Sequence, residues 1–536
     1  MQLLVLLTGL LASQLSQSQP EIALVPIDSR PAAAQFPTMI ADIAGISISS
    51  PNDSELGKFT TPGNAAAIAS WLVKRDYTNS VGLVVSADMI AYGGLIESRV
   101  PNVSLETALK RLECLTEVRK LRPSLPIYVF SALMRTAPTA TNATKSWRMK
   151  LARYVELQNR YQETHESSLL SSMRSLRRQI PSKELDNYLD ARKRNLAVHQ
   201  QLIRMAKQGV INYLVIGADD AQQFGPHVAE TRILKELAAE LSISGLVYFC
   251  EGVDQNAILL VSRAALRNRK FMPKIIVRLS EASAGNRRMP YEAKPLSEVV
   301  RDQIIASGAR PTTDPAEANY TLLLNVPDTE SSSFTTFTDS LKEGLQQKAN
   351  VALADINFDR TGGGDPKMLE FLLQQPDLGN LLAFAGWNTA SNSIGTAVPH
   401  ANMLLLARQT EENAEHRELA HREFLLHRLV GDYGYHRTIR PKAYQLVDAL
   451  PGATREQLTP EAFRVVENYV VRSTKSLVES YFKDTFFERT FKASSKEYKI
   501  TGLSGVAVTL PWPRVFETSV KLQMNVQEIT KQGRRP

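Results

Sequence analysis

The chain has 536 residues, which is too long for one ordinary hydrophobic core, so two or three domains are the default expectation. Its apolar fraction of 43% and charged fraction of 22% are typical of a soluble globular protein. The formal net charge of +8 is small for this length, and the basic residues are scattered along the sequence. Nucleic-acid binding calls for a basic patch with interleaved aromatic residues, so we predict no nucleic-acid partner.

The N-terminus predicts export. Residues Leu3 to Ala12 form a short apolar run that is followed by small and polar residues, as in a secretory signal, although a basic n-region and a clear A-x-A site are missing. The run is too short to span a bilayer, and no other segment is long enough. We therefore expect a signal peptide over residues 1–19, cleaved between Ala12 and Gln19, and a secreted or periplasmic protein without a membrane span.

Apolar runs of strand length recur along the chain, and each is followed by polar or glycine-rich residues and then by a helical period. They occupy residues 22–31, 80–94, 126–138, 211–225, 245–256, 274–283, 319–328, 351–364 and 381–395, with a shorter candidate at 45–49. Near-continuous apolar strands that alternate with amphipathic helices predict parallel sheets covered on both faces. Cys114 and Cys250 fall in such apolar patterns, so we expect them in the core and not in a disulfide scaffold.

The fold class is therefore α/β, with two doubly wound domains as the favoured architecture. The N-terminal α/β domain covers residues 20–270 and includes a helical insertion at 146–208. The second α/β domain covers 271–405 at flavodoxin-like intervals, and a C-terminal helical region with a closing β segment covers 406–536. A single (β/α)8 barrel with extra elements is the alternative, because counting strands in a sequence does not separate the two.

Unusual polar residues gather after the predicted strands. In both architectures ligands bind at the carboxyl ends of parallel strands. The residues at these ends are Asp28, Arg30, Asp88, Arg135, Asp219, Asp220, Glu251, Asp254, Asp355, Asp359, Arg360, Trp387, Asn388 and Asn392. One aspartate in such a place is a routine helix cap, but repeated acids at one end predict a shared polar site, on which Asp28, Asp88, Asp219, Asp220 and Asp254 converge.

The adjacent pair Asp219 and Asp220 is the most unusual part of this set, because like charges repel and buried carboxylates are costly. A plain strand-to-helix loop would also explain it. We expect Asp219 to point toward the site and Asp220 to cap or brace the next helix.

Histidines and the helical insertion supply weaker candidates. No HExxH or CxxC motif occurs, so zinc has little support. We place His227 and His400 near the site, and we expect His416 and His421, five residues apart in a charged helix, to face solvent. In the insertion, Arg192 and Asn195 either reach the site or belong to a solvated helix face.

These stretches resemble a large, mostly bacterial family that is catalogued only as a domain of unknown function, DUF4127. The resemblance covers nearly the whole mature chain and rests on "VPIDSRP", "SADMIAYGGLIESR", "GADDAQQFG", "GWNTASNSIGTA" and "LPWPRVFE". It implies a conserved polar site but no established activity. Ser29 and Gln255 stand where relatives usually have an acid, which implies either reduced activity here or a role for Asp254 and Glu251 instead.

The favoured function is an exported carbohydrate-active enzyme, a glycoside hydrolase, because glycosidic cleavage needs two carboxyl groups, hydroxyl-binding residues and an aromatic platform. The catalytic candidates are Asp219, Asp220, Asp254 and Asp88, and the substrate-binding candidates are Asp28, Arg30, Arg135, Glu251, Trp387, Asn388 and Asn392. This hypothesis needs no cofactor and takes a small polar or carbohydrate ligand as its partner.

Two alternatives stay open. The first is a metal-dependent hydrolase in which Asp28, Asp88 and Asp219 or Asp220 hold Mg²⁺, Ca²⁺ or Mn²⁺ through oxygen ligands. The second is a non-catalytic binding protein whose two α/β domains close on a small polar or sugar ligand.

Overall fold

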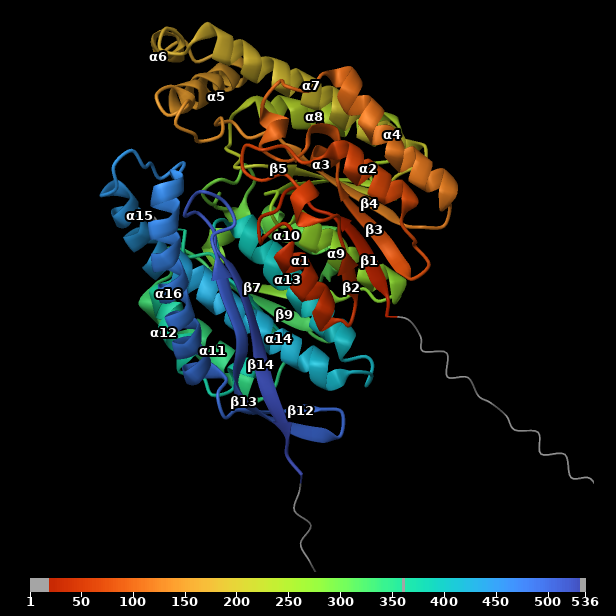
Figure 1. The fold of residues 1–536 in the computed structure, drawn as a ribbon, viewed down its shortest axis with the longest axis vertical. Coiled ribbons are helices and arrows are strands. Elements are labelled where there is room, and N and C mark those ends of the chain that lie inside the picture. The colour runs from red at the N-terminus through yellow and green to blue at the C-terminus, as the bar shows by residue number, and fades with distance from the viewer. Residues whose placement is uncertain (1–18, 359–361, 531–536) are drawn as a thin grey trace, which may run out of the picture.

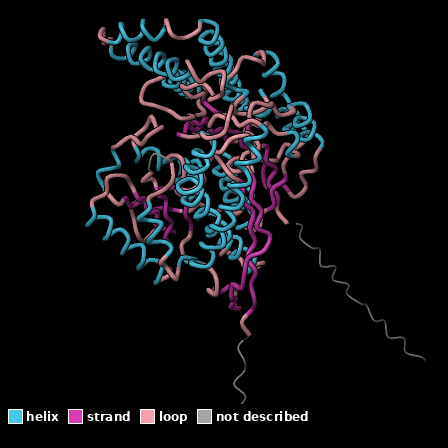
Figure 2. The backbone as a smooth tube through the Cα atoms, turned by 60° about the vertical axis from the view of Figure 1, so that its left-hand side comes forward, coloured by secondary structure: helices cyan, strands magenta, loops and turns pink. Residues whose placement is uncertain are grey.

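The computed structural model of the chain describes residues 19–358 and 362–530, so the predicted signal peptide lies outside the described residues apart from Gln19. Within this part of the chain, two separate parallel sheets are covered by helices, and the C-terminal strands form a third, antiparallel sheet (Figures 1 and 2). Both parallel sheets are open, which confirms the α/β class and excludes the alternative of a (β/α)8 barrel.

The first sheet has six parallel strands in the order β2-β1-β3-β4-β5-β6. Its strands are β1 (Glu21–Val25), β2 (Ser47–Ser49), β3 (Ser80–Ser86), β4 (Ile127–Leu133), β5 (Tyr213–Ala218) and β6 (Val247–Glu251). Its helices are α1 (Gln35–Ile43), α2 (Ala65–Lys74), α3 (Ala87–Tyr92), α4 (Leu105–Leu121), α8 (Pro226–Glu240) and α9 (Asn256–Asn268). Every apolar run predicted before residue 270 contains one of these strands, because strands buried on both faces need apolar side chains at every position.

The second sheet has five strands in the order β11-β10-β9-β7-β8. Its strands are β7 (Lys274–Leu279), β8 (Arg310–Pro311), β9 (Tyr320–Asn325), β10 (Val351–Asp355) and β11 (Ala383–Ala385). Its helices are α10 (Leu296–Ala306), α11 (Ser331–Gln346), α12 (Pro366–Leu373) and α13 (Ala390–Ala407). The chain order across this sheet is that of a flavodoxin-like doubly wound fold.

One hydrophobic core connects the two parallel sheets. The inner faces of both sheets pack against α1, α9, α10 and α13, as Leu24, Ile258, Leu322 and Ile394 illustrate. A second core fills the outer face of the first sheet below α2, α4, α8 and a further helix, α7 (Ser182–Lys207). The sheets are therefore the second and fourth of five layers, and their carboxyl ends can border a common space.

The helical excursion from the first sheet consists of α5 (Arg148–Thr164), α6 (Leu169–Arg177) and α7 (Ser182–Lys207). Residues 148–207, all of them described, contain no strand, as the polar helical pattern indicates. Figure 1 shows α5 and α6 standing away from the body of the molecule, while α7 lies along the first sheet.

The C-terminal region begins with α14 (Ala414–Arg428) and continues without a break into an eleven-residue π-helix, Leu429–Ile439. It ends with α15 (Arg440–Asp448), α16 (Pro460–Thr485) and the antiparallel sheet of β12 (Thr490–Ala493), β13 (Lys496–Thr509) and β14 (Ser519–Glu528). π-helical turns are rare and frequently lie at functional sites. In the described part of the chain, no helix has the length and apolar character needed to cross a membrane.

Candidate functional site

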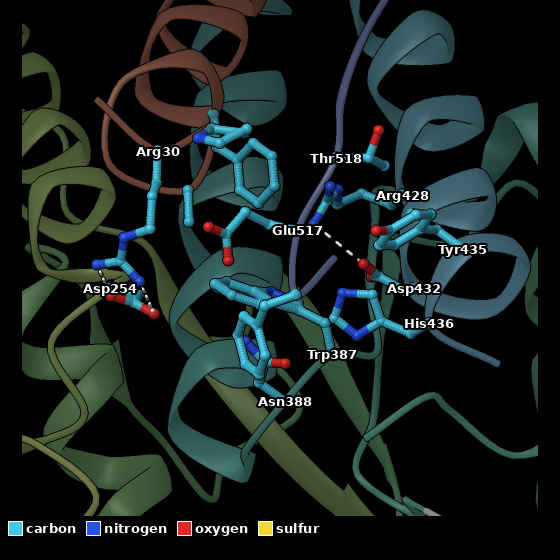
Figure 3. Close-up of a pocket in the computed structure, with 15 residues that line it drawn as sticks. Arg30, Asp254, Trp387, Asn388, Arg428, Asp432, Tyr435, His436, Glu517 and Thr518 are labelled. Carbon is cyan, nitrogen blue, oxygen red and sulfur yellow. Dashed lines mark hydrogen bonds and ion pairs between the residues drawn. The ribbon is translucent and has the colours of Figure 1, made fainter. Parts of the chain in front are cut away.

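A cavity lies where the carboxyl ends of the two parallel sheets meet, and we call it the junction cavity (Figure 3). Its walls come from the loops after β1, β6 and β11, from the π-helix, and from residues 516–518 just before β14. Its polar lining residues are Arg30, Asp254, Asn388, Arg428, Asp432, Tyr435, His436, Glu517 and Thr518. The enclosed volume of about 40 Å³ is enough for a few water molecules.

Arg30 joins two of the predicted aspartates. Its guanidinium lies 2.8 Å from the Asp28 carboxylate and 2.8 Å from Oδ1 of Asp254, although Asp254 follows β6. The backbone N–H of Arg30 also donates to Asp28, so the turn after β1 holds acid and base together. Burial alone would lower the pKa of the arginine, but Asp254 and Asp28 raise it well above its ordinary value. Arg30 therefore stays charged and fixes both carboxylates.

A glycine turn lets Asp254 reach Arg30 from the far side of the sheet. Gly252 has a φ of +77°, a left-handed conformation that favours glycine, and its N–H donates to the carbonyl of Ala218. A Cβ at Gly252 would lie 2.4 Å from Oγ of Ser391. Residues 252–255 thus turn tightly across the end of β5, and α9 then runs back below the first sheet.

The C-terminal segment closes over the same arginine. Trp512 donates its indole N–H to Oγ of Ser29 at 3.0 Å, and the Arg30 guanidinium lies 5.3 Å from the centre of the indole ring. Ser29, one of the two departures from the family pattern, donates in turn to the Gly57 carbonyl. The serine therefore serves to fasten the last strand pair to the first loop of the chain.

Glu517 lines the junction cavity but is not among the predicted site residues, which were chosen because they follow parallel strands. Its carboxylate accepts three hydrogen bonds from Arg514, at 2.8 to 3.0 Å. Figure 3 shows it between the Arg30–Asp254 pair and the indole of Trp387. Glu517 does not follow a parallel strand, so only the distinctive "LPWPRVFE" motif could have drawn attention to it.

The π-helix supplies Asp432 and His436, which sequence analysis also misses. Asp432 pairs with Arg428 at 3.0 Å and accepts the N–H of Gly386 at 2.7 Å. Burial raises the pKa of this carboxyl to about 6, despite Arg428. Burial holds the pKa of His436 well below its ordinary value, so its ring is neutral at pH 7. A π-helix has no clear sequence signature, so nothing in the pattern of apolar residues indicated these side chains.

Trp387 and Asn388, both predicted for substrate binding, do border the junction cavity. Trp387 is only 4% exposed, with its indole N–H bonded to Thr396 and its ring edge against Phe36. Asn388 has a φ of +54° and donates its backbone N–H to Gly362. Asn392 is turned elsewhere, because its side-chain amide donates to Gln255 at 2.8 Å.

Asp219, Asp220 and Arg135 line neither the junction cavity nor the second cavity described below. Asp219 pairs with Arg99, and Asp220 pairs with Arg135 at 2.8 Å. Asp220 is expected to cap or brace the next helix, and the expectation of a cap is wrong. That helix, α8, begins at Pro226 after an uncapped Gly225, and Asp220 instead occupies the loop with a φ of +43°. Desolvation and the charge of Asp219 raise the pKa of Asp220.

Asp88 does not join the other carboxylates at a cavity, so it does not meet the expectation of one converging site. It lies 1% exposed at the start of α3, where one oxygen accepts the N–H of Ala132 at 2.8 Å and the other has no partner among the described residues. Burial raises its pKa to about 7. In the insertion, Arg192 binds Glu230 and Asn195 binds the Ser98 carbonyl, so these residues fasten α7 to α8 and to the segment that follows α3.

Glu251 borders a second, larger cavity of about 330 Å³ beside α8. One of its oxygens accepts the N–H of Ala293 at 3.0 Å, and burial raises its pKa. Gln255, the other departure from the family pattern, is completely buried and donates to the Glu251 carbonyl. The neutral amide therefore takes part in an internal hydrogen-bond network.

Asp355, the last residue of β10, has a structural role. Asp355 accepts hydrogen bonds from Asn325, Tyr433 and the backbone of Asp365. Burial raises the pKa of Asp355 to about 7. Its predicted neighbours Asp359 and Arg360 lie outside the described residues.

Two expectations about histidines are wrong. His421 is fully buried and not solvent-facing. Its Nδ1 lies 2.8 Å from Nε2 of His400 inside the helical layer. His400 sits within α13 and borders neither cavity. His416 is half-exposed as expected and contacts Asp42 at 2.9 Å.

The metal alternative finds no ligand cluster. Among the described residues, no group of three histidine, cysteine, aspartate or glutamate side chains could hold a metal ion. The proposed ligands have separate partners instead: Asp28 binds Arg30, Asp88 binds the N–H of Ala132, and Asp219 binds Arg99. Cys114 and Cys250 are buried free thiols, as predicted for core residues.

Comparison with known proteins identifies a family. A family model described as "Protein of unknown function (DUF4127)" covers residues 22–521. No curated protein and no solved structure matches the chain.

Proposed function

The chain belongs to the DUF4127 family, and because the family's description names no reaction, we propose a function from the site itself: a carbohydrate-active hydrolase that binds a sugar in the junction cavity. One observation carries the proposal. Asp254 and Glu517 border one cavity together with the aromatic ring of Trp387 and the amide of Asn388. Two carboxyl groups with an aromatic surface and hydrogen-bonding groups are what glycosidic cleavage requires.

The two carboxyl groups would have different tasks. Asp254 forms an ion pair with Arg30, which fixes the orientation of its carboxylate and suits a nucleophile or base. Glu517 forms its ion pair with Arg514 of its own segment, and we assign it the role of the general acid. Of the four predicted catalytic residues, Asp254 alone borders the junction cavity and keeps a catalytic role in this proposal.

The cavity must open for a sugar to enter. Its enclosed 40 Å³ is well below the volume of about 300 Å³ at which ligand pockets begin. Residues 510–518 connect β13 to β14 and contact the rest of the site through the hydrogen bonds of Trp512 with Ser29 and of Tyr435 with the Val515 carbonyl, so we infer that this segment is the part that moves. Binding should therefore change the fluorescence of Trp512.

The test is turnover of 4-nitrophenyl glycosides by the purified protein and by Asp254→Asn and Glu517→Gln. A catalytic carboxyl group contributes roughly 10² to 10⁴ in rate, so each variant should lose at least a hundredfold in kcat. Glu479→Gln, on the outer side of α16, is the matched control and should keep the wild-type rate. Equal rates in Asp254→Asn and the wild type would refute the assignment.

A non-catalytic binding protein is the second candidate, because arginines neutralise Asp28, Asp254, Asp219 and Asp220. Tight sugar binding in calorimetry without turnover of any glycoside would support it. We also propose export, on the basis of the apolar run at residues 3–12. N-terminal sequencing of protein recovered outside the cytoplasm should start between residues 13 and 20.

A further inference from the structure

The second cavity lies on the opposite side of β5 and β6 from the inner helices, under the first half of α8, and shares no lining residue with the junction cavity. Its volume of about 330 Å³ is that of a pocket for a small organic molecule. The wall is apolar where Ile216, Val228 and Phe249 contribute side chains.

The charged groups at this cavity are mostly neutralised, with one exception. Lys294 is bonded to Asp302 at 2.6 Å, and Arg232 pairs with Glu163 at 2.9 Å. Lys235 lies at the rim with its ammonium group 5.6 Å from the centre of the Phe249 ring. In the described parts of the chain, no carboxylate comes within ion-pair distance of Lys235.

Glu251 lies at the floor of the same cavity and is 2% exposed. One of its oxygens is used by the N–H of Ala293. Burial raises the pKa of this carboxyl, and in its protonated form the group can donate a hydrogen bond to a ligand oxygen.

We propose that the cavity beside α8 binds a small organic anion, with its carboxylate or phosphate held by Lys235 and Glu251 and its apolar body against Ile216, Val228 and Phe249. The positive rim attracts the charge, and the apolar wall accounts for most of the buried surface. The site is separate from the junction cavity, so it stands whether or not the proposed hydrolase activity does.

The experiment is isothermal titration of the full chain with benzoate, phenyl phosphate and the neutral benzyl alcohol. We expect at least one of the two anions to bind with a Kd of millimolar or below and benzyl alcohol to bind at least tenfold more weakly. A preference for benzoate or for phenyl phosphate identifies the charged group. Absence of binding by both anions, or equal binding of benzyl alcohol, would overturn the proposal.

Two variants locate the site. Lys235→Met removes the unpaired charge and should raise the Kd of the tighter anion at least tenfold, while Lys342→Met, an exposed lysine on α11 over the second sheet, should leave it unchanged. Thr231→Phe fills the cavity from α8 and should abolish binding without changing the circular dichroism spectrum. Wild-type affinity in both Lys235→Met and Thr231→Phe would show that the anion binds elsewhere and would refute the assignment.

Discussion

At the scale of single residues, the site is built from charges that neutralise each other after burial. Arg30 is 8% exposed and Asp28 is 2% exposed, so each would be costly in the interior alone. Their pairing, with Asp254 as the third partner, keeps the loop after β1 in one conformation. The same logic applies to Arg428 and Asp432 on the opposite wall of the cavity.

Replacing Arg30 tests this account. Arg30→Ala leaves Asp28 buried without its partner, and breaking a buried ion pair from one side costs about 3 to 5 kcal/mol. We expect a loss of that size in the free energy of unfolding, measured by urea denaturation. Arg153→Ala, which removes an exposed pair with Glu156, should cost about 0.5 kcal/mol or less. A loss for Arg30→Ala no larger than that of Arg153→Ala would contradict the account.

Asp88 gives a prediction about pH. Its pKa is about 7 in the folded protein and 3.8 ordinarily, so the folded state holds its proton more tightly. The stabilisation from this carboxyl is complete below pH 3.8 and declines as the pH rises, until the group is ionised in both states above pH 7. Asp88→Asn has no titratable group at this position, so its free energy of unfolding lacks this pH dependence.

The variant should therefore gain stability relative to the wild type between pH 4 and pH 8, by at most about 4 kcal/mol. Thermal or urea unfolding of both proteins at the two pH values measures the difference. A stability difference between Asp88→Asn and the wild type that is the same at both pH values would show that Asp88 is ionised throughout.

At the scale of elements, the π-helix is what brings Asp432, Tyr435 and His436 to one wall of the cavity. It packs closely on α16, and Gly434 is at the contact. A Cβ at Gly434 would lie 1.9 Å from Cδ2 of Leu477, which is closer than any two carbon atoms without a bond can approach.

Gly434→Ala should therefore either turn Leu477 out of its rotamer or force the π-helix and α16 apart. Overpacking of this kind costs roughly 1 to 3 kcal/mol, and we expect the melting temperature to fall accordingly. Gly245→Ala is the control, because a Cβ there would meet no atom within 4 Å. An unchanged melting temperature in Gly434→Ala would mean that Leu477 moves aside freely.

At the scale of the whole molecule, the two parallel sheets share one core through α1, α9, α10 and α13. Because the two sheets share this core, neither can unfold without disrupting the packing of the other. We therefore expect one cooperative unfolding transition for the chain. Calorimetry, tryptophan fluorescence and far-ultraviolet circular dichroism should give the same midpoint. Two resolved transitions would show that each sheet unfolds separately.

A cavity-creating change in the shared layer extends this test. Ile258→Ala in α9 removes a fully buried side chain from the core of both sheets and should cost about 2 to 5 kcal/mol. The single transition should move as a whole to lower temperature. A shift of one part of the transition only would contradict a shared core.

The sequence by itself determined the fold class, the strands and the helical excursion, because an apolar run and its period are local properties of the chain. It also placed Arg30, Asp254, Trp387 and Asn388 at strand ends, and these four residues border one cavity. The same rule failed for Asp88 and for Asp220. The position of a residue directly after a strand indicates the end of the sheet at which the residue lies. This position does not indicate the direction in which the side chain points.

Only the tertiary structure decided which residues meet. The Arg30–Asp254 pair joins positions 224 residues apart, and the contact depends on the turn at Gly252 and on the path of α9. Glu517 and Ser29 reach the site from opposite ends of the chain, and Asp432 and His436 come from a π-helix that no local pattern announces. Contacts between distant segments depend on the packing of whole layers, which apolar periodicity does not encode.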